Sequence, residues 1–242
     1  MLYARATRWT FESFTPEAFP TPLGRFVYDW ARRMTPTDDH LHPNETQRIE
    51  AFSDGVFAIA ITLLIIEIGV PHVTAGDSLS KALGDLWPDY FAYVLSFVMI
   101  GIYWANHHSF FRLFVRTDHY FLVLNVLFLM AIAFLPFPTA VLGDYLHDSP
   151  HRDTAVRLYA GGLVFPAAAW LLLWLYANVR GLVDERLAPD YVRFLTAQYA
   201  LSNALYGAAL MLAFVEAWVA LAIVVGLTLL YLLPPRRPRF IQ

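Results

Sequence analysis

Six long apolar stretches constrain the fold of this chain more than any other feature of its sequence. They lie near residues 49–70, 88–111, 119–141, 156–178, 194–214 and 215–233. Crossing about 30 Å of hydrocarbon takes roughly 20 helical residues, and each stretch is close to that length. Only 15% of the residues are charged, and the mean hydropathy is +0.48. The sequence therefore predicts an all-α, polytopic membrane protein with six transmembrane helices.

The last two stretches almost touch. They are separated only around Phe214-Val215-Glu216. One helix running through both would be far longer than a membrane requires, so two helices are the preferred interpretation and a single long helix is the alternative.

The distribution of Lys and Arg predicts the orientation. With the N-terminus inside, all but three of the 17 Lys and Arg residues fall on the cytoplasmic side, the exceptions being Lys81, Arg152 and Arg157. Basic residues accumulate in cytoplasmic loops of membrane proteins, and an even number of spans returns the chain to its starting side. We expect both termini in the cytoplasm and a multi-pass protein of the cell membrane.

Three regions follow from this layout: a cytoplasmic N-terminal extension over 1–47, a membrane domain over 48–233 and a basic cytoplasmic tail over 234–242. Within the extension, apolar residues recur at helical spacing, namely Leu23, Phe26, Val27, Trp30 and Met34. This pattern is typical of an interfacial helix on an anionic leaflet. A partly disordered tail with chance amphipathicity is an equally open alternative.

The first membrane stretch begins with polar residues, in FSDGVFAIAITLLIIEI over 52–68. A carboxylate in or near hydrocarbon is expected to face protein or water and to be paired. His107, Asn106 and Asn125 are candidate partners for Asp54, because the predicted topology brings them to a similar depth. The simpler alternative is that Asp54 only stabilises the N-terminal end of its helix.

Beyond the polar start, Ile59, Leu63 and Ile66 are spaced to share one face of a helix, and Thr62 lies on an adjoining face. On composition alone, such a stripe usually packs against another helix.

Three further patterns occur in order along the chain. They are Arg48-x-x-x-Phe52-Ser53-Asp54, Trp104-x-x-His107-x-x-x-Phe111 and LNVLFLMAIAFLPFPTAVLG over 124–143. Together they resemble the transmembrane protein 175 family of potassium channels, in its prokaryotic form with one repeat per chain. The resemblance covers about residues 46–233 and is strongest in the first three stretches.

This resemblance implies a homotetramer whose pore is lined by the first helix of each subunit, since the FSD motif occurs once. It implies a hydrophobic constriction at Ile59, widened by Leu63 and Ile66, with Thr62 beside it. K⁺ would be the permeant ion. No TVGYG-like stretch occurs, so a filter of stacked carbonyls is not expected.

The resemblance also implies that polar residues form a network that holds the pore helix in place: Arg48, Ser53, Asp54, Trp104, His107 and Asn125. A separate prediction, made from position and charge, is that Glu67 at the outer end of the helix contributes to an acidic ring at the pore mouth of a tetramer. The alternative for Glu67 is a solvated interfacial acid.

No enzyme motif is evident: the chain lacks HExxH, GxSxG and a glycine-rich phosphate loop. We expect no catalysis, no cofactor, no metal site and no nucleic-acid partner; the expected partners are the lipid bilayer, other copies of the chain and K⁺. A proton-coupled secondary cation transporter using Asp54 and His107 is the main alternative. An intramembrane enzyme with the same pair is a weaker one, because it lacks a nucleophile or metal.

Overall fold

The structure of the chain is a computed structural model that describes residues 43–74, 78–234, 236, 238 and 240. The chain divides into two units, Met1–His42 and Pro43–Gln242, and only the second is described. The interfacial helix predicted within 1–47 lies outside the described residues, as does much of the basic tail.

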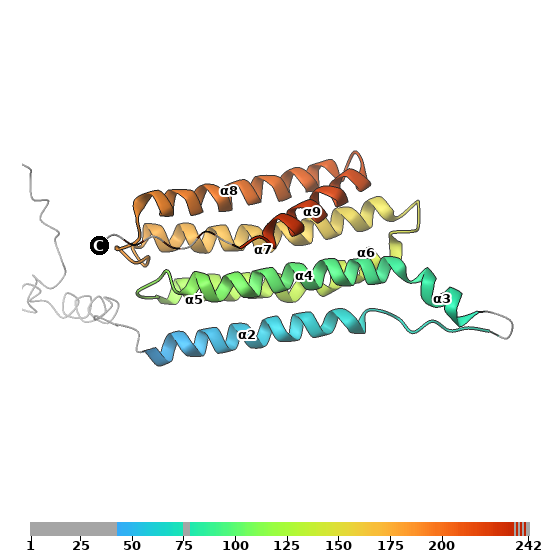
Figure 1. Cartoon of the computed structure of the whole chain (residues 1–242), viewed down its shortest axis with the longest axis horizontal. Helices are drawn as coiled ribbons and strands as arrows, with labels where there is room; N and C mark the ends of the chain where they lie inside the picture. Colours follow the sequence, from blue (N-terminus) through green and yellow to red (C-terminus); the bar gives the residue numbers. More distant parts are fainter. Residues whose placement is uncertain (1–42, 75–77, 235, 237, 239, 241–242) are drawn as a thin grey trace, which may run out of the picture. The chain divides into compact units, whose positions relative to one another are not determined.

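Helices dominate the described part of the chain (Figure 1). They are α2 (Pro43–Ile66), α3 (Leu79–Asp85), α4 (Trp87–Phe111), α5 (His119–Phe134), α6 (Pro136–Tyr145), α7 (Arg152–Val179), α8 (Pro189–Leu212) and α9 (Ala217–Tyr231). The long helices lie side by side and alternate in direction. Each of the six predicted stretches overlaps at least one of them. The described residues form no strand, only two isolated bridges between loop residues.

The first stretch is placed slightly differently from the prediction of 49–70. Helix α2 begins earlier, at Pro43, and ends at Ile66. Proline suits the first turn of a helix because its missing N–H would have no partner there. After Ile66, Gly69 and Pro71 disfavour further helix, so Glu67 lies just beyond the helix end.

The third stretch is interrupted rather than continuous. Asp118 caps α5, its carboxylate accepting a hydrogen bond from the Phe121 N–H at 2.8 Å. The helix stops before Pro136 and resumes as α6, because Pro136 and Pro138 lack the N–H groups that would continue its hydrogen-bond ladder. Together α5 and α6 still form one apolar stretch of 27 residues.

The fifth and sixth stretches are two helices, not one. Helix α8 ends at Leu212 and α9 begins at Ala217. Between them the Glu216 carboxylate accepts a hydrogen bond from the Trp218 N–H at 3.3 Å, which caps the new helix.

Three helical stretches are long and apolar enough to span a membrane: Arg48–Ile66, His119–Tyr145 and Arg152–Val179. The pair α3 and α4, bent by 46°, makes a fourth if it is one span. These stretches make the chain an integral membrane protein. Helix α8 is long but more polar, and α9 has 15 residues, so six spans remain a prediction.

Close contacts between α4, α6 and α7 hold the centre of the bundle together. A Cβ added to Gly143 of α6 would lie 3.1 Å from the Cα atom of Asp89 in α4. A Cβ on Gly162 of α7 would lie 3.0 Å from the Cγ atom of Pro138 in α6. Helix α2 packs against α4, α5 and α6 and lies at the edge of the bundle in Figure 1. Much of its surface is therefore left uncovered.

Candidate ion pathway along helix α2

One face of α2 attaches the helix to the rest of the protomer. Ser53, Phe57, Ala60 and Leu64 follow the spacing i, i+4, i+7, i+11, and each is at most 1% exposed. This spacing is that of a helix with one packed stripe. The α2 residues away from this stripe consequently project from the protomer.

The projecting surface is apolar at the positions predicted to line a pore. Ile59 is 61% exposed, Leu63 40% and Ile66 72%. Exposing a row of large aliphatic side chains to bulk water is unfavourable in free energy. Within a membrane the row faces lipid, another subunit or a narrow pore.

Thr62 lies on the same projecting side of α2 and is exposed. Its hydroxyl donates to the backbone oxygen of Ala58 at 2.9 Å, with Ile59 O at 3.0 Å. The hydroxyl proton is thus bonded within the helix, which leaves the oxygen lone pairs as the polar feature that Thr62 presents outward.

A buried polar triad joins α2, α4 and α5. The Asn125 Nδ2 group donates to Ser53 Oγ at 3.3 Å, and His107 Nε2 lies 3.0 Å from Asn125 Oδ1. Each residue is at most 2% exposed. Because the amide nitrogen of Asn125 donates to Ser53, its oxygen is the acceptor, and His107 carries its proton on Nε2. The structure therefore brings three of the six predicted network residues together.

Aromatic rings enclose this triad. The His107 ring is stacked on Phe128 with centroids 5.9 Å apart, lies 4.6 Å from the Phe111 ring and meets Phe57 edge-on at 5.5 Å. These contacts fix the imidazole and separate it from water. The role of Phe57 was not predicted, although its position four residues after Ser53 places it on the same face of α2.

Asp54 is not part of the triad. Its Oδ1 atom accepts a hydrogen bond from Trp104 Nε1 at 2.9 Å, on the exposed side of α4. The three partners considered for Asp54 do not bond to it: His107 and Asn125 bond to each other, and Asn106 lines a separate pocket. Adjacent helical residues point about 100° apart, so Asp54 cannot share the buried face of Ser53.

A second polar contact lies beside the first and was not predicted. The Nδ1 atom of His108 is 3.4 Å from the Glu50 carboxylate. Glu50 precedes Asp54 by four residues on α2, and His108 follows Trp104 by four on α4. The pair on α2 and the pair on α4 each have i, i+4 spacing, so the two antiparallel helices contact each other at two successive turns. This matching spacing is visible in the sequence and could have predicted the contact.

Two predicted residues stand apart from these groups. Arg48 is exposed and forms no hydrogen bond or ion pair with the described residues. Glu67 is exposed just past the end of α2, and it lines a shallow recess with Asp89 and Tyr93. Among the described residues, no group of three or more His, Cys, Asp or Glu side chains could hold a metal ion.

Comparison with known proteins matches the part of the chain that carries these groups. The family model of the endosomal/lysosomal potassium channel TMEM175 matches residues 48–136. A potassium channel of Streptomyces collinus is 44% identical over 180 residues, which cover 74% of this chain and 87% of that protein. The mouse endosomal/lysosomal proton channel TMEM175 is 33% identical over 199 residues, covering 76% of this chain but 39% of the mouse protein.

Solved structures agree with the sequence comparison. The crystal structure of a lysosomal potassium-selective channel TMEM175 homologue from Chamaesiphon minutus has a TM-score of 0.70 and 41% identity. It covers 78% of this chain and 97% of the other. The resemblance in the motifs, the sequence identity over most of the chain and the shared fold lead to one conclusion: the chain belongs to the TMEM175 family of potassium channels.

Proposed function

We propose that this chain is the subunit of a homotetrameric, potassium-selective channel of the cell membrane, with helix α2 of each subunit lining the pore. The observation that carries the proposal is the uncovered apolar stripe of Ile59, Leu63 and Ile66 on a helix whose other side is firmly packed. The family supports this function, since its bacterial relatives are named potassium channels.

The proposed topology has six spans and two cytoplasmic termini. It takes α8 and α9, with 24 and 15 residues, as the fifth and sixth spans. Alternation of the helices supports it, because the loops 112–118 and 180–188 and the described residues after α9 then lie at one end (Figure 1). That end carries most of the arginines that the structure describes, as expected of a cytoplasmic face.

In the proposed mechanism, four Ile59 side chains form the narrowest part of the pore, and Leu63 and Ile66 widen it outward. A hydrophobic ring offers no oxygen ligands, so an ion crosses it only after losing part of its water. Removing water from Na⁺ costs more than from K⁺, because the smaller ion holds its water more tightly. Moderate preference for K⁺ follows, and dewetting of the ring provides a closed state.

The polar contacts on α2 hold the lining residues in position. The buried triad fixes the rotation of α2 about its axis through Ser53, and the Asp54–Trp104 hydrogen bond restrains it from a second direction. Glu67 raises the local concentration of cations at the outer mouth by its negative charge. A hydrocarbon-lined filter depends on such anchors, because side-chain position alone sets its diameter.

Cation flux into liposomes containing the purified protein tests this proposal. Potassium and sodium gradients are compared for the wild type, Ile59→Asn and Ile65→Asn. Ile65 is the matched control: it is the same residue type on the same helix, 53% exposed, and about 120° away around the axis. We expect passive potassium uptake whose discrimination against sodium falls in Ile59→Asn and persists in Ile65→Asn.

Other outcomes have definite meanings. Channel flux with unchanged selectivity in Ile59→Asn would place the filter elsewhere. Potassium movement only under a proton gradient would replace the channel with a proton-coupled transporter. Because the mouse relative is named a proton channel, a pH-sensitive dye inside the liposomes belongs in the same experiment.

A further inference from the structure

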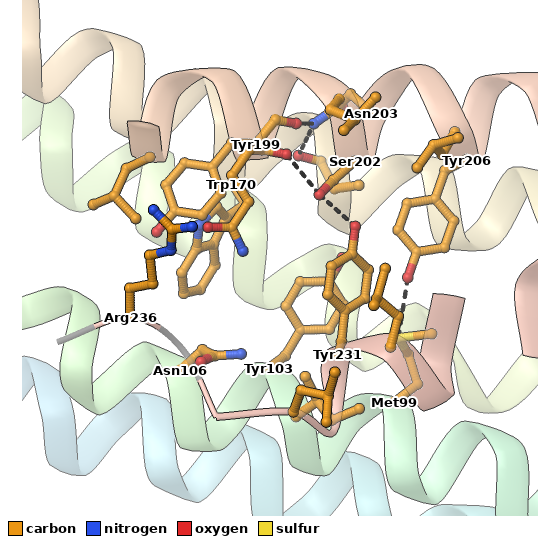
Figure 2. Close-up of a pocket in the computed structure, with 18 of the residues that line it drawn as sticks. Met99, Tyr103, Asn106, Trp170, Tyr199, Ser202, Asn203, Tyr206, Tyr231 and Arg236 are labelled. Carbon is orange, nitrogen blue, oxygen red and sulfur yellow. Dashed lines mark hydrogen bonds between the residues drawn. The ribbon is translucent and has the colours of Figure 1, made fainter. Parts of the chain in front are cut away.

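A cavity of about 560 Å³ lies on the other side of the bundle from the α2 stripe, bounded by α4, α7, α8, α9 and the residues that follow α9 (Figure 2). Its volume is within the range of about 300–1,000 Å³ typical of sites for small organic ligands. No α2 residue lines it. The proposed ion pathway therefore does not use this cavity.

The two ends of the cavity differ in chemistry. Figure 2 shows Arg236 and Asn106 at one end and Met99 and Tyr206 at the other. The Arg236 guanidinium lies over the Phe194 ring, 4.4 Å from its centre, and the Arg236 backbone oxygen accepts a hydrogen bond from the Tyr191 hydroxyl at 3.2 Å. These contacts hold a positive charge at the cavity mouth, and Arg236 forms no ion pair with any described carboxylate.

Two side-chain amides line the cavity near this charged end without a partner among the described residues; one of them, Gln198, follows Phe194 by one turn of α8. Asn106 of α4 and Gln198 of α8 both line the cavity, and neither amide forms a hydrogen bond to any part of the chain that the structure describes. Amides can both donate and accept hydrogen bonds. The charged end thus offers one cation and two adaptable polar groups to a ligand.

Deeper in the cavity several polar groups are already bonded to the protein. The Tyr206 hydroxyl donates to the Met99 sulfur at 3.4 Å, and Ser202 is bonded to the hydroxyl of Tyr231. The Asn203 amide donates to the backbone oxygen of Ala167 at 3.0 Å. With these groups satisfied, the remaining wall is largely aliphatic and aromatic, which suits a hydrocarbon chain.

We propose that this cavity binds an anionic phospholipid, with the phosphate on Arg236, the polar linkage on Asn106 and Gln198, and one acyl chain extending toward Met99 and Tyr206. The direction of the polarity gradient agrees with this occupant. Arg236 lies at the arginine-rich end of the bundle, where headgroups of the proposed cytoplasmic leaflet would lie, and the cavity runs from there toward the membrane centre. Phosphatidylcholine also carries a phosphate, but its choline cation cancels the net negative charge that favours binding beside the guanidinium. A free phosphate would leave the apolar end unfilled.

Native mass spectrometry of the detergent-solubilised protein tests the site. Phosphatidylglycerol and phosphatidylcholine with identical acyl chains are titrated against the wild type, Arg236→Gln and Arg193→Gln. Arg193 is the matched control, since it is exposed on α8 near the same end but does not line the cavity. We expect saturable binding of one phosphatidylglycerol per subunit, about tenfold weaker in Arg236→Gln, the loss expected for one charge-assisted hydrogen bond, and unchanged in Arg193→Gln.

A second variant tests the hydrocarbon part of the site. Gln198→Trp keeps Arg236 but fills the cavity, so it should also lose the bound lipid, whereas added inorganic phosphate should not displace lipid from the wild type. Equal binding of both lipids, equal loss in Arg193→Gln and Arg236→Gln, or full binding in Gln198→Trp would each overturn the proposal. So would a cavity closed by contact with a neighbouring subunit, seen as no lipid retained by the wild type. Conduction is not measured, so the result is independent of the proposed channel function.

Discussion

Replacing Asn125 with leucine removes the central member of the buried triad while nearly preserving its volume. The change leaves the His107 Nε2–H without its acceptor and the Ser53 hydroxyl without its donor. Ser53 can rotate to donate to a carbonyl of its own helix. The His107 ring cannot compensate in this way, because three aromatic rings hold it and it is only 2% exposed.

The expected loss can be bounded from both sides. Hydrogen bonds between membrane helices contribute about 0.6 kcal/mol on average, whereas leaving one buried polar group unsatisfied costs about 1–3 kcal/mol. The second effect should dominate at His107. We therefore expect Asn125→Leu to lower the free energy of unfolding by about 1–3 kcal/mol.

Unfolding by SDS in mixed micelles, followed by helical circular dichroism, measures this loss. Val126→Leu is the control: it alters the next residue of α5, which is 53% exposed, and should stay within about 0.5 kcal/mol of the wild type. In a His107→Phe background, Asn125→Leu should cost about 0.6–1.7 kcal/mol less than in the wild type. An equal cost in both backgrounds would refute the hydrogen-bond explanation, and a cost no larger than that of Val126→Leu would refute the importance of the triad.

Two further predictions concern packing and pH. Gly143→Ala should lower the free energy of unfolding by about 1–3 kcal/mol, because its Cβ would meet the Asp89 backbone. Gly226→Ala is the control, because its Cβ would meet nothing within 4 Å, and it should not lower stability. Thermal unfolding compares the two variants. In the loop after α7, hydrogen bonds from the Arg186 side chain and backbone hold the pKa of Asp184 below its ordinary value of 3.8. The stability that this interaction provides is present above pH 3.8 and is lost as the pH falls through the lowered pKa. The difference in thermal midpoint between the wild type and Asp184→Asn should therefore shrink toward pH 3. A difference that stays constant with pH would contradict this account.

The positions of the long helices could be predicted because an apolar stretch of membrane length has few alternatives to a helix. Their ends were harder to place. The interruption before Pro136 and the cap at Glu216 depend on single residues acting on local hydrogen bonds, and the early start of α2 at Pro43 lies in a segment without an apolar signal. Periodicity averages over many residues, and such local effects are lost in the average.

The site divides in the same way. The common depth of His107 and Asn125 was predicted from the topology, whereas Ser53 was placed in their network only by the family resemblance; the structure brings the three together. The partners predicted for Asp54 from depth were wrong, because its contact depends on the rotation of α2 relative to α4, which decides whether a side chain meets His107 or Trp104. The resemblance had placed Trp104 in the same network as Asp54 without pairing them. The Glu50–His108 contact depends on the same rotation.

The sequence by itself determined which segments are too apolar to remain in water, and hence that this is a membrane protein, how many apolar stretches it has and to which family it belongs. Tertiary structure decided which face of each helix is covered: the Phe57 side of α2 is packed, the Ile59 side is not, and four separate helices enclose the cavity beside Arg236. The physical reason is that the hydrophobic effect has no direction and can be summed along a chain. Hydrogen bonds and close packing are directional, so they are determined only when the helices meet.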